Sequence, residues 1–427
     1  MKNAILAGII NILIVLNSYA LEIGEVNIHG YISQGYMQSD KNNYIAMTED
    51  GTFKIKEVGF NISTEFTSNF RAGLQVVSVQ MGEIGGNEPK IDWAYGDYRW
   101  NNYIGIRIGK MKNPIGLYNE TKDLDAVHTS IFLPSSAYII SLRDSLIALD
   151  GVGLYGNIPI GLAGSLSYYG IRGTTTIEDN GSTAKYISSV NILNDVSVRE
   201  GDSNSAKITW HTPLDGLKFA GSIFQIELYI KGKTTDHYVW PVKLGMDMDL
   251  YKEGKTLNAE YNIKPYEVKV LSCEYALGNF TFAAEGNWTD SHREFDLKYP
   301  DGKHVQYSYV GPSLGYYTSG YYRFLDKFEL GIAYGEYFID RDDKDGKKAV
   351  KTYAYLKSLG LVKEVPADYN FWHKDLTLTF RYDINENFIF KLEGHLMDGA
   401  AQLMKQDNPD GVSRNWFLFV SKVTFIF

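Results

Sequence analysis

The chain has 427 residues, of which 44% are hydrophobic and 14% aromatic, and its formal net charge is −9. That charge argues against nucleic acid as a partner, because nucleic-acid-binding domains present a basic face. The single cysteine, Cys273, excludes an intramolecular disulfide framework, and we interpret it as a small apolar residue on a strand. The 32 tyrosines and 21 phenylalanines favour strands.

The beginning of the chain has the pattern of an export signal. A short positive start precedes an apolar run from Ala4 to Leu16, and Ser18 and Ala20 supply the small residues of a cleavage site. The apolar run is too short to remain as a membrane-spanning helix. We therefore expect a signal peptide at residues 1–20 and one mature domain at residues 21–427, with a buried N-terminal helix as the alternative.

The rest of the chain alternates apolar and polar residues in short runs, for example at 58–63 and 376–381. A period of two predicts strands with one apolar face. In a soluble sandwich that face would form the core, whereas in a membrane barrel it would meet lipid and the polar face would line the lumen. Alternation does not separate these two folds, but the lengths of the connections do.

Short turns and long loops alternate along the chain. Each short turn carries turn-forming or charged residues between two alternating runs. The seven short turns are expected at 67–69, 101–102, 157–159, 213–216, 278–279, 326–327 and 385–387. The eight long loops are expected at 38–53, 81–90, 111–148, 170–204, 229–264, 290–304, 339–372 and 398–414.

This alternation predicts an all-β fold, a transmembrane antiparallel β-barrel of about 16 strands, with short periplasmic turns and long extracellular loops. Both ends of the barrel then lie at the short-turn rim. Almost every proline falls in a turn or loop, and Pro312 is the exception, where we expect a bulge or a strand end.

The final strand supports the membrane location. Phe417, Phe419, Val423, Phe425 and Phe427 share one face of an alternating run that ends the sequence. A terminal aromatic residue in such a strand resembles the C-terminal targeting signal of bacterial outer-membrane proteins. Together with the export signal, it predicts a barrel in the outer membrane of a Gram-negative bacterium.

A local motif surrounds the third long loop. Residues 92–95 read Asp-Trp-Ala-Tyr, residues 107–117 read Arg-Ile-Gly-Lys-Met-Lys-Asn-Pro-Ile-Gly-Leu, and residues 150–156 read Asp-Gly-Val-Gly-Leu-Tyr-Gly. This pattern resembles the phosphate-selective porin superfamily over roughly residues 88–156. The resemblance implies a 16-stranded, trimeric barrel whose third loop folds into the lumen and narrows it. No run of closely spaced inward arginines and no lysine cluster is evident, which puts phosphate specificity itself in doubt.

The composition of the third loop agrees with that position. Residues 115–147 contain too many apolar side chains for a freely solvated loop, including Ile131, Phe132 and Tyr138. The inner barrel wall would cover them if the loop enters the lumen. We therefore expect a constriction loop at residues 111–148, and the alternative is a lid or a trimer contact outside the pore.

Charged side chains on this loop and on the inner wall are the candidate site. A basic ring would favour anions, whereas opposite signs on opposite walls would give a transverse field that orients solutes, and both arrangements remain open. Each single charge could also be a satisfied salt bridge. The candidates at the constriction are Arg107, Lys110, Lys112, Glu120, Lys122, Asp123, Asp125, Arg143 and Asp144. The pore-lining candidates are Arg71, Asp92, Lys207, Lys218, Glu285, Arg381 and Lys391, together with Glu57, Glu65, Glu329, Glu393 and Lys422.

Other chemistry finds little support. The acidic run at 340–345 hints at calcium, but the EF-hand register fails because Lys344 takes the fifth position. A short helix is expected from Lys348 to Leu361. The eight histidines form no metal-binding spacing, and no Gly-x-Ser-x-Gly elbow is present. We therefore expect no enzyme and no cofactor.

The sequence thus predicts a passive channel for small hydrophilic solutes or ions, surrounded by outer-membrane lipid, with a slight preference for anions. The third loop would set the pore size, and the charges around it would set selectivity. Three alternatives remain: a channel specific for phosphate or organic acids, a non-conducting sleeve around electron carriers, and a surface receptor or adhesin.

Overall fold

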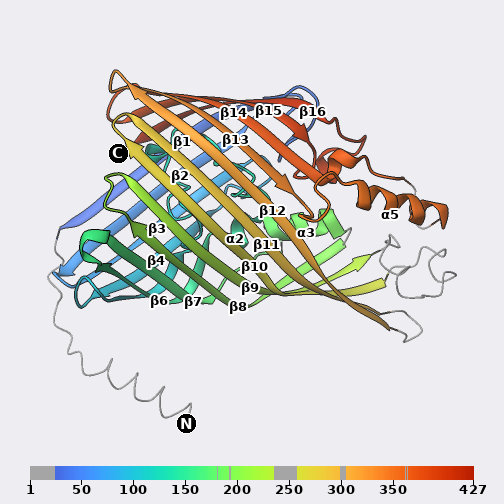
Figure 1. Cartoon of the computed structure of the whole chain (residues 1–427), viewed down its shortest axis with the longest axis horizontal. Coiled ribbons are helices and arrows are strands. Elements are labelled where there is room, and N and C mark those ends of the chain that lie inside the picture. The colour runs from blue at the N-terminus through green and yellow to red at the C-terminus, as the bar shows by residue number, and fades with distance from the viewer. Residues whose placement is uncertain are drawn as a thin grey trace, which may run out of the picture.

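A computed structural model shows sixteen antiparallel strands that close into one barrel, with β1 (Val26–Ser39) hydrogen-bonded to β16 (Asn415–Ile426). The structure describes residues 25–179, 181–191, 194–234, 257–298, 304–360, 362 and 364–427. The prediction of a 16-stranded antiparallel barrel is confirmed (Figure 1). The predicted signal peptide at residues 1–20 lies outside the described residues.

The strands between β1 and β16 follow one another around the barrel in sequence order. They are β2 (Thr52–Thr67), β3 (Phe70–Met81), β4 (Pro89–Arg99), β5 (Gly105–Lys112), β6 (Ala148–Pro159), β7 (Ser165–Thr174), β8 (Asn194–His211), β9 (Leu217–Thr234), β10 (Leu257–Leu277), β11 (Phe280–Lys298), β12 (His304–Phe324), β13 (Phe328–Phe338), β14 (Trp372–Asp383) and β15 (Phe388–Gly399). The helices are α2 (Arg143–Leu146), α3 (Ser182–Asn191) and α5 (Lys347–Ser358). Among the described residues, no helix is long and apolar enough to cross a membrane.

Short turns gather at one end of the barrel, the short-turn end, and the long connections gather at the other, the long-loop end. Six of the predicted turns match the breaks between strands. The turn predicted at 157–159 is wrong in position, because β6 continues through Pro159 and the chain reverses at 160–164. Gly161 (φ 64°) and Gly164 (φ 93°) adopt there the positive φ angles that glycine tolerates.

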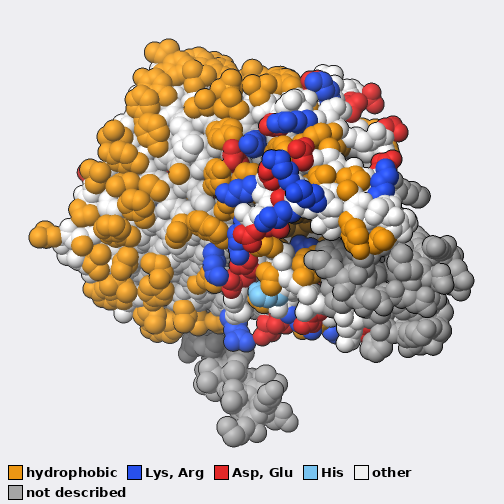
Figure 2. Space-filling view, turned by 45° about the vertical axis from the view of Figure 1, so that its right-hand side comes forward, with side chains coloured by type: hydrophobic (Ala, Val, Ile, Leu, Met, Phe, Trp, Pro, Cys, Tyr) orange, Lys and Arg blue, Asp and Glu red, His pale blue; other side chains and the backbone are white. Residues whose placement is uncertain are grey.

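The strands present apolar side chains outward and polar ones inward over much of their length. On β16, Phe417, Phe419 and Val423 are exposed, whereas Lys422 and Thr424 on either side of Val423 are buried inside the barrel. Exposed apolar side chains cover much of the outer surface of the barrel on the face shown in Figure 2. We call this surface the apolar belt.

Strands β8 to β12 are longer than the alternation predicted, and they extend past the belt at the long-loop end (Figure 1). The loops expected at 170–204, 229–264 and 290–304 are wrong in their bounds, because much of each range is strand. In this extension the outward positions are charged, as at Glu260 and Lys269, and a band of mixed charge borders the belt (Figure 2). Many inward positions of the extension are apolar instead, as at Tyr261 and Val268.

Two apolar clusters lie inside the barrel towards the long-loop end. The first joins the inner faces of β8 to β11 to α3 and to the start of the third loop, and it includes Ile115, Ala184, Ile187, Phe224, Ile226, Leu228, Tyr261, Val268 and Val270. The second joins β1 to β3 and β16 to neighbouring loops, and it includes Met37, Tyr44, Ile45, Ile55, Val77, Val79, Ile131, Met404, Trp416 and Leu418. These clusters include residues of five long connections, namely β1–β2, β3–β4, β5–β6, β7–β8 and β15–β16, so parts of these connections are packed inward.

Pro312 lies within β12, opposite Asp290 of β11, with no register shift. Neither the expected bulge nor a strand end is found there. Pairing of β12 with β13 ends at Leu314, so no hydrogen bond to β13 is lost because proline lacks an N–H. The Pro312 carbonyl accepts a hydrogen bond from the Arg341 amide at 3.0 Å.

The helix expected at 348–361 is α5, which follows the acidic run. Asp343 accepts hydrogen bonds from the Lys348 amide at 3.0 Å and the Ala349 amide at 2.8 Å. This carboxylate therefore caps the helix.

Candidate channel lumen

The third loop, residues 113–147 between β5 and β6, crosses the inside of the barrel. Its first part binds the wall formed by β8 to β11. The Gly116 amide donates to Ser222 Oγ at 2.9 Å, and the Leu117 amide donates to Glu285 Oε1 at 2.7 Å. Glu120 forms an ion pair with Lys207 at 2.7 Å. The predicted loop therefore lies against three predicted charged residues, Glu120, Lys207 and Glu285.

Glu285 is a buried carboxylate that holds loop and wall together. Besides the loop amide, it accepts hydrogen bonds from Ser272 Oγ at 2.6 Å, Tyr317 Oη at 2.8 Å and Tyr138 Oη at 2.5 Å. Tyr138 belongs to the loop and the other two donors to the wall. This number of donors stabilises a buried carboxylate and makes Glu285 an anchor of the loop.

Two glycines allow the loop to approach the wall at β12 and β13. A Cβ atom at Gly315 would lie 1.9 Å from the Ser136 carbonyl oxygen, and one at Gly335 would lie 2.5 Å from Ser136 Oγ. Only residues without a side chain leave room for this contact. The loop therefore rests against β12 and β13 as it passes between its other attachments.

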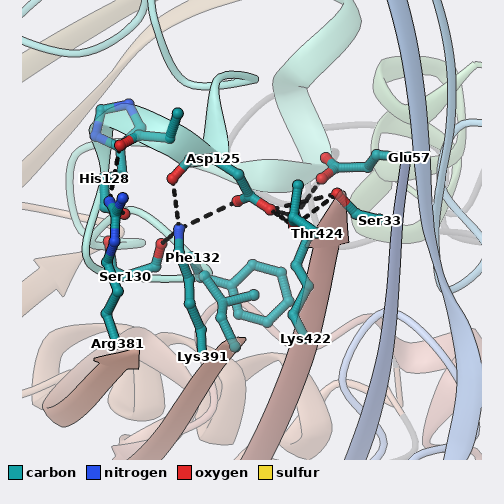
Figure 3. A network of polar contacts seen from close by, with 12 residues as sticks. Ser33, Glu57, Asp125, His128, Ser130, Phe132, Arg381, Lys391, Lys422 and Thr424 are labelled. Carbon is teal, nitrogen blue, oxygen red and sulfur yellow. Dashed lines mark hydrogen bonds and ion pairs between the residues drawn. The ribbon is translucent and has the colours of Figure 1, made fainter. Parts of the chain in front are cut away.

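Asp125 anchors the middle of the loop to the opposite wall (Figure 3). Its carboxylate lies 3.3 Å from Lys391 Nζ on β15 and 3.0 Å from Lys422 Nζ on β16. Thr424 and Ser33 donate hydroxyl hydrogen bonds to the same group. Burial raises the pKa of Asp125, but Lys391 and Lys422 outweigh it and hold that pKa well below its ordinary value.

Further contacts extend this attachment. Arg381 Nη1 donates to the carbonyls of Ala126 at 2.8 Å and His128 at 3.0 Å. Glu393 on β15 accepts from the Ile131 amide at 2.6 Å and from the next amide at 3.2 Å. Predicted wall charges thus bind loop backbone as well as loop side chains.

A third set of charges lies where the loop leaves β5. Lys112 forms ion pairs with Asp123 and, at 2.6 Å, with Asp92 of β4, and Arg143 also binds Asp123. Burial raises the pKa of Asp123, but Arg143 and Lys112 outweigh it and keep the carboxylate ionised. Four predicted residues are therefore brought together.

Three predicted constriction residues, Asp144, Lys110 and Arg107, do not join these networks, and Arg107 lies with Asp97 nearer the short-turn end. Asp144 accepts hydrogen bonds from the Thr183 amide at 3.0 Å and Ser182 Oγ at 2.8 Å at the start of α3. Lys110 donates to the Ile91 carbonyl at 2.8 Å on the neighbouring strand. The contacts of Asp144 and Lys110 serve local structure.

Another group of charges lines the lumen near the short-turn end. Asp97 binds Arg71 at 2.8 Å and Arg107 at 3.1 Å, and the Tyr155 hydroxyl donates to it at 2.5 Å. The Arg107 guanidinium also lies over the rings of three tyrosines, at 4.5 Å from the Tyr155 centroid.

Sequence reasoning missed several members of this group. Asp97 shares the period-two face of β4 with Tyr95, so alternation could have identified it. Lys218 pairs with Glu274 at 2.7 Å, and Arg323 pairs with Asp383 at 2.5 Å. Glu274 lies opposite Lys218 on the adjacent strand β10, and Asp383 lies on β14, two strands from Arg323. Both pairings depend on strand register, which alternation does not give.

Metal chemistry finds no support in the described ranges, which contain no group of three or more His, Cys, Asp or Glu placed to hold an ion. The predicted charges form a set of paired groups around a crossing loop. This arrangement holds the loop across the lumen and leaves ionic and aromatic surfaces on either side of it.

No family model matches the sequence, and no curated protein matches it. Solved structures match along nearly the whole chain. OmpF of Salmonella typhi, in complex with daunomycin, is 11% identical over 94% of this chain and 97% of its own, with a TM-score of 0.54. Outer-membrane expressed OmpT of Vibrio cholerae is 10% identical over 95% and 100%, with a TM-score of 0.52.

The outer membrane channel DcaP of Acinetobacter baumannii is 13% identical over 94% of this chain and 97% of its own, with a TM-score of 0.50. At such identities the similarity shows a shared fold and does not extend to the solute. The resemblance to phosphate-selective porins therefore stays a prediction.

Proposed function

We propose that the protein is a passive channel of porin type for small hydrophilic solutes in the outer membrane of a Gram-negative bacterium. The observation that carries this proposal is the closed barrel with an apolar belt outside, a polar wall inside and one loop attached across the lumen. A belt of this kind fits lipid, and a polar lumen fits water. Transport then needs no cofactor and no chemical step.

The third loop sets the size of the passage in this proposal. Solutes move down their concentration gradient through the space that the loop leaves free. Glu285 attaches the third loop to one side of the barrel wall, and Asp125 attaches it to the opposite side. Contacts on both sides of the lumen therefore hold the loop in position. Charges beside the passage then act on each ion that passes.

Two finer features belong to the same proposal. We expect a slight preference for anions and a homotrimer in the membrane. The anion preference needs cations that face water rather than cations shielded by carboxylates. A trimer would place part of the apolar belt between subunits and leave the remainder to lipid.

A substrate-specific or non-conducting barrel is the second candidate. The two apolar clusters inside the long-loop end favour it, because they fill space that a wide general pore would leave open. Such a channel would show conductance that micromolar solute blocks, and a sleeve or receptor would show little conductance.

Planar-bilayer recording of the purified protein under a KCl gradient tests the proposal. Stepwise conductance with a reversal potential on the anion side is the expected result. Conductance with cation preference would retain the channel and reject the anion preference. Absence of conductance in correctly folded protein would overturn the open-channel proposal.

A further inference from the structure

Three ion pairs near the short-turn end expose the cation more than the carboxylate, whereas Arg381 with Asp383 has the opposite order. The Arg71 side chain is 52% exposed, whereas its partner Asp97 is 1% exposed. The Lys218 side chain is likewise more exposed (34%) than that of its partner Glu274 (16%). The Arg323 side chain is also more exposed (40%) than that of its partner Glu329 (15%). In each of these three pairs the cation faces open space and the carboxylate lies behind it.

These three cations lie at similar heights on separate parts of the wall. Arg71 is the second residue of β3, Lys218 the second residue of β9, and Arg323 the penultimate residue of β12, so each is beside a short turn. Each of these side chains points inward. Leu74, Phe219 and Tyr322 lie an odd number of positions from Arg71, Lys218 and Arg323 on the same strands, and they are exposed on the apolar belt. The cations are therefore spread around one mouth of the barrel.

The central pairs differ from these pairs. Lys112 with Asp92, and Lys422 with Glu57, are buried on both sides of the pair, so neither charge is presented to water. Lys207 and Glu120 have the reverse order, with the carboxylate more exposed. The orientation at the mouth is thus a local property and not a feature of every pair in the lumen.

We infer that Arg71, Lys218 and Arg323 form a basic collar at the short-turn mouth that selects small anions, including carboxylates. This inference rests on the proposed channel function and places its charge filter at the mouth rather than at the third loop. Each pair has no net charge, but an ion in the lumen is closer to the cation than to the carboxylate. The resulting field raises the local concentration of anions.

Two features limit the size of the effect. Glu65 of β2 is exposed near the collar, opposite Arg71 in the strand register, and its charge opposes anions. Salt also screens the collar, because the Debye length is about 8 Å at physiological ionic strength. The selectivity should therefore be modest and should weaken as the salt concentration rises.

A triple variant, Arg71→Gln, Lys218→Gln and Arg323→Gln, tests the inference in bilayer recordings. Three of the four carboxylates left behind keep other partners, since Arg107 remains on Asp97, the Tyr118 hydroxyl remains on Glu274, and Arg381 remains on Asp383. The fourth, Glu329, loses its ion pair with Arg323. The fold should therefore persist, which thermal unfolding in detergent checks. The anion-to-cation permeability ratio should fall by about twofold at low salt and less at 1 M salt.

The matched control removes three cations from the outer surface, as Lys231→Gln, Lys269→Gln and Lys298→Gln. It changes the net charge equally but leaves the lumen intact, so its permeability ratio should equal that of the unmodified protein. An unchanged ratio in the collar variant, with normal conductance, would overturn the inference and leave the channel proposal standing. Absence of conductance in the unmodified protein would overturn the channel proposal, and with it the inference.

Discussion

Strand β10 passes through two regions with opposite side-chain chemistry. Near the short-turn end, Ser272 and Glu274 face the lumen and Leu271 is exposed on the apolar belt. In the extension, Val268 is buried inside the barrel and Lys269 is exposed outside. From Val268 to Glu274 the alternation keeps its phase while the residue types on the two faces are exchanged, and a register shift between Ile263 and Tyr266 changes the phase further along the extension.

The exchange follows from what surrounds each region. Lipid around the belt requires apolar outer side chains, and a hydrated lumen accepts polar inner ones. Above the belt, water surrounds the strands, while α3 and the third loop cover their inner face. The extension is therefore organised like a soluble sheet, with an apolar core inside and charges outside. The following predictions test this difference.

The largest effect is expected from Lys422→Met in the belt region. The Lys422 ammonium binds Glu57 and Asp125, and all three groups are buried. Its removal leaves a buried carboxylate without compensation, which should lower the free energy of unfolding by about 4 kcal/mol. Chemical or thermal unfolding in detergent measures this change.

The double variant Lys422→Met with Glu57→Gln is the control. It removes the uncompensated carboxylate together with the ammonium, so part of the lost stability should return. Equal stability of the single variant and the unmodified protein would contradict the role of paired charges inside the belt.

Phe224→Ala in the extension should cost somewhat less, about 3 kcal/mol, through the cavity it leaves in a packed core. Phe224 is fully buried within the first apolar cluster. Phe219 on the same strand is exposed on the belt, and Phe219→Ala should cost clearly less because lipid fills the space. Unfolding measurements on both variants compare the two environments, and equal losses would show that the inner cluster is not a packed core.

The same difference explains what sequence could predict. Alternating connection lengths gave the strand number, because turn residues between alternating runs depend on local chemistry. The ranges 229–264 and 290–304 were assigned to loops because charged residues are dense there. Described charges in these ranges, such as Glu260 and Lys298, lie on the outer face of strands. A single sequence does not show where the apolar belt ends.

The candidate site was predicted in part for a similar reason. The third loop and most of its charged residues could be identified from composition, and alternation placed Lys391 and Glu285 inward correctly. Asp97 with Arg71, and Glu274 with Lys218, are opposite each other on adjacent strands, so these pairings depend on the strand register. A one-residue shift would move each side chain to the opposite face, so sequence alone could not assign the pairs.

A smaller effect is expected from Ile332→Lys on the belt. Ile332 is exposed in the middle of β13, where the proposed lipid would meet a charge, so the free energy of unfolding should fall by about 2 kcal/mol. The outward Lys231 of the extension is the comparison, and Lys231→Ile should bring no measurable gain or loss. Unfolding in lipid bilayers measures both, and a tolerated lysine at position 332 would contradict a lipid-facing belt.

The smallest perturbation is cysteine labelling along β10, which should leave stability unchanged. Cys273 lies on the outward face of the belt region, two positions from Leu271. A charged maleimide applied to intact cells should therefore leave it unmodified, because the reagent does not enter lipid. In a Cys273→Ser background, Lys269→Cys should react, since position 269 is outward and above the belt. Reaction at both positions would place the boundary lower on β10, and reaction at neither would place the extension within the membrane.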